Sequence, residues 1–269
     1  MTEYTHEGAL IARKDNLAAL SSPESMRAAC ETQKILEWRP SAFDRSRSLI
    51  FNFGFCRGVM PFCECADGLS AVSRDVAALS RVGRPVCFVI TGFTQTDGET
   101  TALLSRRAVQ RAYIENTLDL LVPGDIISCR VTHLARFGAF ADVGRGVAAL
   151  LPLDSVSISR ISDPSERLAE ADIIKCAVRS RDELGRLTLT LKELLGSWEQ
   201  NAALFSAGET VSGIIRTSMS YGVFVELMPN LAGLSEPFEG AREGNGRGCL
   251  HKEHTARKNE DQARDKLGI

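Results

Sequence analysis

A repeated pattern constrains this chain more than any other feature. The tetrapeptide Phe137-Gly138-Ala139-Phe140 returns 84 residues later as Tyr221-Gly222-Val223-Phe224. The same offset relates further pairs, namely Gly124-Asp125 with Gly208-Glu209, Asp142 with Glu226, and Leu150 with Leu234. A shared offset without a gap indicates a duplicated domain, because a chance motif would not bring its surroundings with it. The 269 residues are enough for two or three small domains.

Short strand-like runs separated by turn residues follow one another along the chain. We predict strands at 49–53, 86–90, 126–131, 140–143, 173–178 and 187–191. In the last run Thr188 and Thr190 alternate with leucines, as in a half-buried strand, and Asp182-Glu183-Leu184-Gly185 predicts the turn before it. Helices are predicted at 23–36, behind the N-cap Ser22, and at 101–117 and 191–207 as linkers. About five short strands per module favour small antiparallel barrels of the OB type.

Composition argues against several other classes of protein. No apolar run reaches the roughly 18 residues of a membrane helix, and the first residues lack the features of a signal peptide, so we expect a cytoplasmic protein. Eight scattered cysteines favour reduced thiols. Neither a nucleophile pattern around the four histidines nor a glycine-rich phosphate loop is recognisable, so we predict no enzyme, no cofactor and no metal. The net charge of −2 concerns solubility rather than a local site.

The residues 122–195 carry a series of motifs in a fixed order. They are Pro123-Gly124-Asp125, Val131, Phe137 to Asp142, Gly146, Leu150-Leu151-Pro152, and Gly185 to Glu193. In order and spacing this stretch resembles an S1 RNA-binding domain, the tandem OB module of bacterial ribosomal protein S1. Residues 205–240 resemble the first three strands of a second copy. A degenerate copy at about 29–112 depends on Gly54, Gly58-Val59-Met60-Pro61 and Val82 to Val86.

The resemblance implies an all-β chain of tandem five-stranded OB-fold (S1-type) barrels with short linking helices. We predict an N-terminal tail with the start of a short helix at 1–28, a first module at 29–112 and a complete middle module at 118–196. A truncated third module at 204–244 and an aberrant tail at 245–269 follow. The first module has Trp38 where the family usually has Gly, and it lacks the family's aromatic pair at 45–49. We therefore interpret it as a structural or protein-contact copy.

OB folds bind single-stranded nucleic acid by stacking bases on aromatic side chains along a basic groove. Phe137 and Phe140 would face opposite sides of a regular strand, so we expect a bulge at Gly138 that brings both rings to one face. The resemblance places Asp182 and Arg186 beside them, and Pro152 where the family often has His. The predicted RNA-binding residues are Phe137, Phe140, Asp182, Arg186, Lys192, Arg216, Tyr221 and Phe224. The predicted partner is single-stranded RNA such as mRNA, with the ribosome as a further candidate and no membrane. The alternative is a non-catalytic protein-interaction adaptor.

The module pattern stops after Gly244, where the third barrel still needs two strands. The chain continues as Asn245 to Lys252, which is polar and is predicted to be strandless. One permitted coding of 245–267, read one base later, gives MAVAVYIKSILPERMKIKLVIS and then a stop. That sequence contains a strand, a turn and an alternating strand. We therefore predict that residues from about 245 are out of frame and that the third module is unstable or partly ordered. The middle module, with its five strands, should survive alone.

Overall fold

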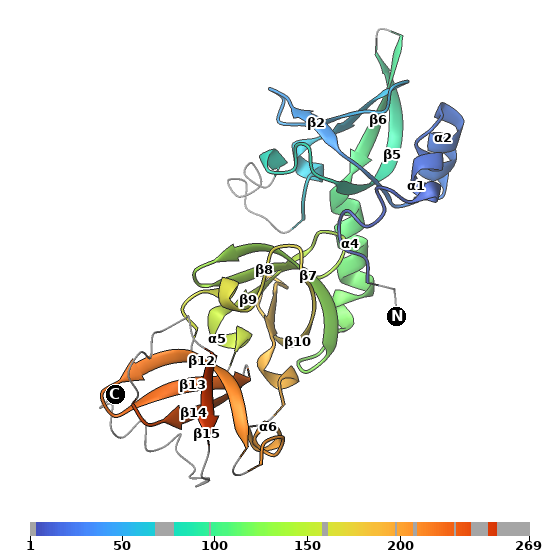
Figure 1. Ribbon diagram of the computed structural model, residues 1–269. Helices are drawn as coiled ribbons and strands as arrows, with labels where there is room; N and C mark the ends of the chain where they lie inside the picture. Colours follow the sequence, from blue (N-terminus) through green and yellow to red (C-terminus); the bar gives the residue numbers. More distant parts are fainter. Residues whose placement is uncertain are drawn as a thin grey trace. The chain divides into compact units, whose positions relative to one another are not determined.

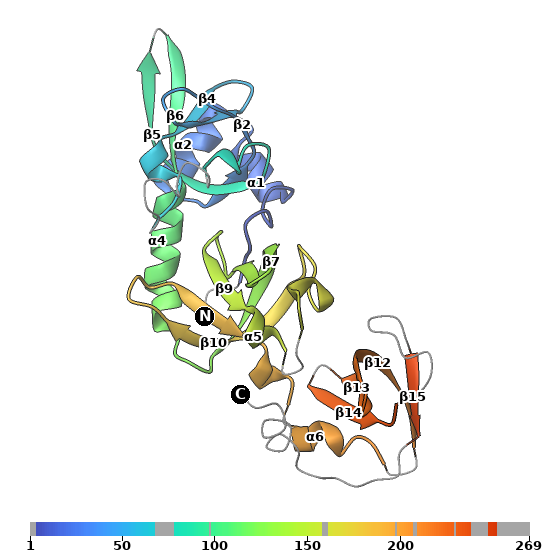
Figure 2. The ribbon, with the colours of Figure 1, turned by 90° about the vertical axis from the view of Figure 1, so that its left-hand side faces the viewer.

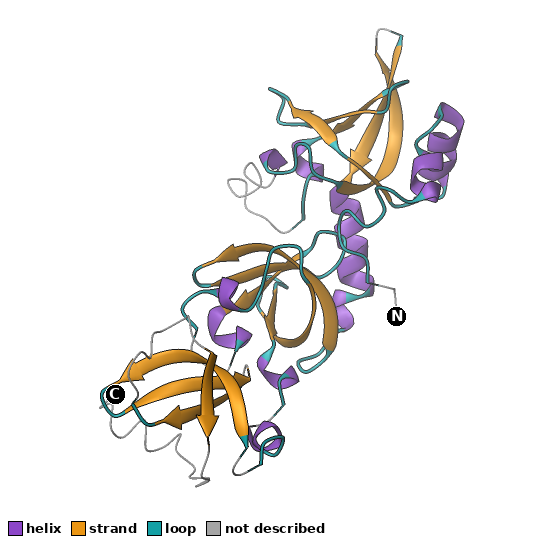
Figure 3. Ribbon diagram, in the orientation of Figure 1, coloured by secondary structure: helices purple, strands orange, loops and turns teal. Residues whose placement is uncertain are grey.

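The computed structural model describes residues 4–67, 78–96, 98–157, 161–196, 198–206, 209–228, 230–237 and 247–251 (Figure 1). Within these ranges strands dominate and form three separate sheets (Figure 3). Two compact units result, one of Met1–Val156 with Ser162–Leu191 and one of Ser157–Ile161 with Lys192–Ile269. The predicted all-β class with tandem barrels and short helices is confirmed.

The middle module is a closed barrel of five strands. These are β7 (Ile126–Ala135), β8 (Gly138–Asp142), β9 (Ala148–Pro152), β10 (Ile173–Arg181) and β11 (Leu187–Thr190), paired in the order β10-β11-β9-β8-β7. The parallel pair is β9 with β11. Strand alternation buries Val131, Leu151 and Leu189 inside the barrel. Closure leaves no free strand edge, which allows strands this short to form a stable sheet.

The first module follows the same cycle of pairings with a divided first strand. Its strands are β1 (Leu36–Trp38), β2 (Pro40–Phe43), β3 (Leu49–Asn52), β4 (Arg57–Met60), β5 (Val86–Thr96) and β6 (Glu99–Ser105), in the order β1-β5-β6-β4-β3-β2. The two outer members, β1 and β2, are separated in the chain by Arg39 alone. One strand bent at Arg39 therefore joins both ends of the sheet. Phe51 and Phe88 meet edge to face in the core, with ring centroids 5.4 Å apart.

The helices differ in extent from the sequence prediction. α1 (Lys14–Ala19) was not predicted, and α2 (Pro23–Glu31) begins behind the capping box of Ser22 but ends before residue 36. The helix expected at 101–117 is α4 (Arg106–Asn116), because residues 99–105 pair as β6 and Ser105 Oγ caps the helix by accepting from Ala108 N. The helix expected at 191–207 is divided into η4 (Lys192–Leu194) and α6 (Trp198–Ala202). Gly196 separates them with φ of +76°, a conformation that a helix cannot contain.

The N-terminal segment, predicted to be a tail, is anchored by a buried carboxylate. Glu7 is 7% exposed and accepts hydrogen bonds from Arg106 Nε at 2.7 Å and Cys87 N at 3.1 Å, and it is also paired with Arg81. Its own amide donates to Asp142 Oδ2 of β8 at 2.7 Å. Burial alone would raise the pKa of Glu7, but the two guanidinium groups lower it overall. One residue thus connects the first module with the middle barrel, since its carboxylate binds α4 and β5 and its backbone amide binds β8.

The third module is an open sheet in the described part of the chain. Its strands are β12 (Thr210–Met219), β13 (Gly222–Met228), β14 (Leu231–Ser235) and β15 (Arg247–His251), in the order β14-β13-β12-β15 (Figure 2). The prediction that the chain from Asn245 on is strandless is wrong for residues 247–251. Strand pairing uses backbone groups, so a polar segment without proline can pair with the open edge of β12.

Candidate nucleic-acid interface

Two aromatic rings lie together on the surface of the middle barrel. Phe137 stands in the turn between β7 and β8 and is 60% exposed, whereas Phe140 lies in β8 and is half-buried. Their ring centroids are 5.9 Å apart and the ring planes meet at 87°. This edge-to-face contact holds the rings in a fixed geometry, and the exposed faces remain open to a stacking partner. The structure therefore brings the predicted pair together.

The bulge beside the two rings is not at Gly138, where the sequence predicted it. The register shift lies in β7, between Val131 and His133, rather than at Gly138 in β8. Gly138 has φ of +153°, and a Cβ atom there would lie 2.4 Å from the carbonyl oxygen of Leu151. The residue is thus needed for the close approach of β9. The turn is held further by Leu153 N, which donates to Phe137 O at 2.9 Å.

A row of residues continues from Phe140 across the barrel. Phe140 pairs with Leu150 in β9, and Leu150 pairs with Thr188 in β11. All three are half-buried, so they share the outward face of their strands. The row forms a surface of one ring, one aliphatic side chain and one hydroxyl. Arg186 lies two residues before Thr188, in the turn that leads into β11.

Asp182 and Arg186 form an ion pair across the turn between β10 and β11. Arg186 Nε donates to Asp182 Oδ2 at 2.6 Å, and Asp182 Oδ1 accepts from Arg186 N at 2.8 Å and Leu184 N at 3.0 Å. The backbone hydrogen bond from Arg186, followed by the side-chain bond, lowers the pKa of Asp182 below its ordinary value. Asp182 thus shapes the turn and orients the exposed guanidinium. The predicted turn is confirmed by the bond from Asp182 N to Arg186 O.

In the third module the aromatic pair is repeated with nearly the same geometry. Tyr221 is 61% exposed, and its ring centroid lies 6.4 Å from that of Phe224 at 88°. Arg216, predicted to contact RNA, pairs through Nε with the buried Glu226, and its side chain is 18% exposed. Because a buried carboxylate needs a counter-charge, this pairing gives Arg216 a role in the fold. Lys192 lies in η4 and is half-buried.

His133 belongs to the surface but was not assigned a role from the sequence. The bulge in β7 pairs it directly with Phe140, and its ring is exposed. Its Nδ1 lies 3.2 Å from Glu170 Oε1. A flat ring beside Phe140 can extend a stacking surface. Only the register decides that His133 faces Phe140, and no motif in the sequence signals it.

The corresponding row in the first module is aliphatic. Ser41 Oγ donates to Ile50 O at 3.1 Å, as Thr132 Oγ1 donates to Phe140 O at 3.1 Å in the middle barrel. Ile50 pairs with Val59, and Val59 pairs with Leu103 in the parallel strand β6. Ile50 therefore takes the place of Phe140, and the row Ile50, Val59 and Leu103 contains no aromatic ring.

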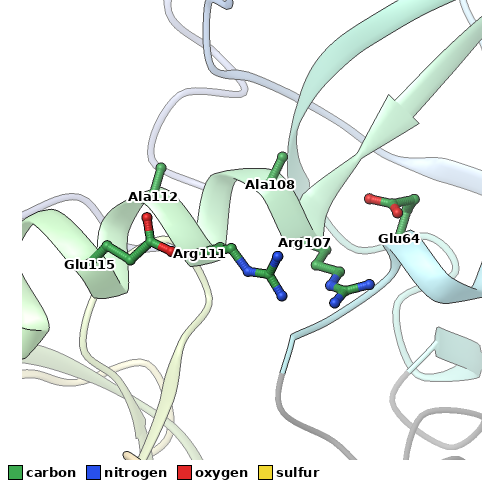
Figure 4. Close-up of a pocket in the computed structure, with 6 residues that line it drawn as sticks. All are labelled: Glu64, Arg107, Ala108, Arg111, Ala112 and Glu115. Atoms are coloured by element: carbon green, nitrogen blue, oxygen red, sulfur yellow. The ribbon is translucent and has the colours of Figure 1, made fainter.

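A shallow hollow of about 350 Å³ lies along α4 (Figure 4). It is lined by Glu64, Arg107, Ala108, Arg111, Ala112 and Glu115. Arg107 Nε and Arg111 Nη2 both donate to Asp67 Oδ1, at 3.1 and 3.3 Å. Their charges are thus already compensated by a neighbouring carboxylate.

The described residues contain neither a candidate metal site nor a candidate membrane-spanning helix. In those ranges no three His, Cys, Asp or Glu side chains come close enough together to hold a metal ion. None of the helices in the same ranges is long and apolar enough to span a membrane.

Comparison with known proteins places the middle barrel in a family. Residues 121–192 match the family of the S1 RNA binding domain. The "Small ribosomal subunit protein bS1 homolog" of Bacillus cereus is 33% identical over 138 residues, which are 49% of this chain and 36% of the relative. The "Small ribosomal subunit protein bS1" of Rhizobium meliloti is 30% identical over 230 residues, which are 81% of this chain and 39% of the relative.

The chain matches little more than a third of the length of these relatives. Among solved structures, GSP13 from Bacillus subtilis is similar at 22% identity with a TM-score of 0.27, covering 32% of this chain and 73% of that one. That score is too low to carry an argument. The sequence matches and the closed barrel carry the conclusion. Residues 121–192 form an S1 RNA binding domain, folded as a closed five-stranded barrel, and the chain is similar to the small ribosomal subunit protein bS1.

Proposed function

We propose that the middle barrel binds single-stranded RNA and that Phe137 and Phe140 provide the stacking surface. The observation that carries the proposal is the pair of rings on one face, in a domain that matches the S1 family. Stacking of a base on such a ring contributes roughly 1–3 kcal/mol. Two exposed faces can therefore hold two neighbouring bases without selecting a sequence.

Cations next to the rings supply the contact to phosphate. Arg186 is oriented by Asp182, and Arg136 is exposed beside Phe137. Each phosphate neutralised in single-stranded RNA contributes about −0.7 to the slope of log K against log salt. Replacing Arg186 with Ala should make that slope shallower by about 0.7 while binding to all sequences weakens alike.

The function of the relatives suggests where such RNA binding is used. Both relatives are named as proteins of the small ribosomal subunit. We extend the proposal to mRNA on or near the ribosome, in translation. The chain's role would then be non-catalytic, because stacking and phosphate contacts require no reacting group.

The test is fluorescence anisotropy of a labelled single-stranded RNA with the full chain. Phe137→Ala and Phe140→Ala should each weaken binding by about 5- to 150-fold, the range that 1–3 kcal/mol gives. Phe55→Ala is the matched control, because it removes an exposed ring from the first module. Equal losses in all three variants, or salt-insensitive binding, would contradict the proposal.

A polypeptide-binding role for the first module is the second candidate. The observation that favours it is the aliphatic row Ile50, Val59 and Leu103, which replaces the aromatic row. The same anisotropy experiment separates the two modules. Ile50→Ala should leave RNA binding unchanged if this face contacts protein.

A further inference from the structure

Within its described residues, the third module has no strand in the place that β11 takes in the middle barrel. In the middle barrel β11 pairs with β9, through Thr188 and Leu150. In the described part of the third module, β14 is paired with β13 on one side and is otherwise an edge of the sheet. Leu234, the repeat of Leu150, is 56% exposed. The core of this module is small: Ile215, Val223 and Val225 are buried, and Leu227 packs against them.

β15 occupies the correct place with an unsuitable sequence. It pairs Arg247 with Ile214 and His251 with Thr210, and subtracting 84 from the β12 numbers gives the pairing of Ile173 with Arg130 and Ala177 with Ile126. The register is therefore that of β10. The residues in that register are Arg-Gly-Cys-Leu-His, with Gly248 opposite Gly213, whereas β10 begins Ile-Ile-Lys-Cys-Ala. Glycine weakens a strand interior, and two glycines face each other here.

The gene read one base later encodes a strand-like amino-acid sequence. Part of that sequence follows from the amino acids of this chain, whichever synonymous codons the gene uses. Each codon of the shifted frame consists of the second and third bases of one original codon and the first base of the next. Its first and third bases are therefore fixed by the amino acids at most positions, and only its middle base, the original third base, is free to vary. Residues 258–262 must then read Lys or Arg, Met or Thr, Lys or Arg, Ile or Thr, Lys or Arg. This is a forced alternation of basic residues with apolar or β-branched residues, which is the period of a strand.

A second forced stretch precedes the first. Residues 251–254 in the shifted frame read Ile or Thr, Lys or Arg, Asn or Ser, Ile or Thr. The end of β10 reads Val178-Arg179-Ser180, which is the same succession of residue types. Three residues, 255–257, separate the two forced stretches, as the turn at Asp182 to Gly185 separates β10 from β11. The shifted frame thus contains both strands, in the order that the barrel requires.

We propose that the edge of β12 now paired with β15, together with the edge of β14, is the binding surface for a two-stranded segment. That segment is MAVAVYIKSILPERMKIKLVIS or a synonymous-codon variant of it. The segment is encoded one base out of frame in the chain's own gene. Its first strand takes the place of β15 beside β12, moved by one residue so that shifted-frame residues 251–253 align with Val178-Arg179-Ser180 of the middle barrel. Its second strand closes the sheet against β14. Closure covers Leu234 and supports the strands that carry Tyr221 and Phe224. The proposal concerns the fold of the third module and is independent of RNA binding.

The coding DNA gives the first test. At six residues the third base of the original codon determines the amino acid in the shifted frame. T at that base gives Met or Ile, and C gives Thr. The six residues are Asn245, His251, His254, Asn259, Asp261 and Asp265. We expect T at most of them, as an apolar strand requires. C at most of them would overturn the proposal.

The second test uses the full chain with residues 245–269 replaced by the shifted-frame sequence. A matched control carries the same residues in scrambled order, without alternation. We expect amide hydrogen exchange in Leu231–Ser235 to slow by at least tenfold relative to the control, because β14 gains a hydrogen-bonded neighbour. Exchange as fast as in the control would overturn the proposal.

Discussion

Removing the carboxylate of Glu7 should uncouple the two N-terminal modules. The side chain is 7% exposed and faces Arg106, which is itself 3% exposed. Removing one partner of a buried pair usually destabilises by about 3–5 kcal/mol, since the remaining charge is left buried. Arg106 retains hydrogen bonds to Cys65 O at 3.1 Å and Gly146 O at 2.9 Å. We therefore expect Glu7→Gln to have an effect near the lower limit, about 3 kcal/mol.

The assay is urea unfolding of the full chain, followed by far-ultraviolet circular dichroism. In thermal unfolding of a unit of this size, the same loss of 3 kcal/mol corresponds to a fall in Tm of about 6–12 °C. Glu99→Gln, which changes an exposed carboxylate of β6, should have little effect. Arg106→Met should also destabilise, but the double variant should lose less than the sum, because both charges are then removed together. A loss below about 1 kcal/mol for Glu7→Gln, or strict additivity, would refute this reasoning.

Three further predictions follow from the same structure. Gly138→Ala should destabilise the middle barrel by more than about 1 kcal/mol, because the new Cβ would lie 2.4 Å from Leu151 O, and a normal urea midpoint would contradict this. Burial raises the pKa values of Asp142 and Glu37, so both bind protons more tightly in the folded chain and stability should rise as pH falls from neutral through their folded pKa values. Asp142→Asn should reduce that rise in a pH series of urea midpoints. Glu7 has the opposite effect, because its pKa is lowered: it stabilises the fold above its ordinary pKa, and this stabilisation is lost as pH falls further. In thiol labelling of the native chain, the exposed Cys63 should react before Cys65, because burial raises the pKa of Cys65 to about 11, and equal rates would contradict the described burial.

The repeat and the strand alternation could be read from the sequence because both are local patterns. Four of the five strands of the middle module and the turn at Asp182 to Gly185 were found in this way, whereas β9 was indicated only by the family resemblance. Helix boundaries were less accurate. The side chains of residues 101–105 are compatible with a helix or a strand, and pairing with β5 makes this segment part of the strand β6. The aromatic pair could be identified, but the strand that contains the bulge could not.

What only the tertiary structure decided concerns contacts between distant residues. The sequence predicts Glu7 as part of a terminal tail, but in the structure α4 and β5 place Arg106 and Cys87 in contact with it. The ion pair between Arg216 in β12 and the buried Glu226 in β13 could not be predicted from the sequence, because it depends on the pairing of the two strands. His133 gains its place beside Phe140 from a register shift. The sequence by itself determined the repeat and the barrel class, because hydrophobic periodicity and turn residues act locally. Burial and charge pairing depend on which segments the closed fold brings together, so they appeared only in three dimensions.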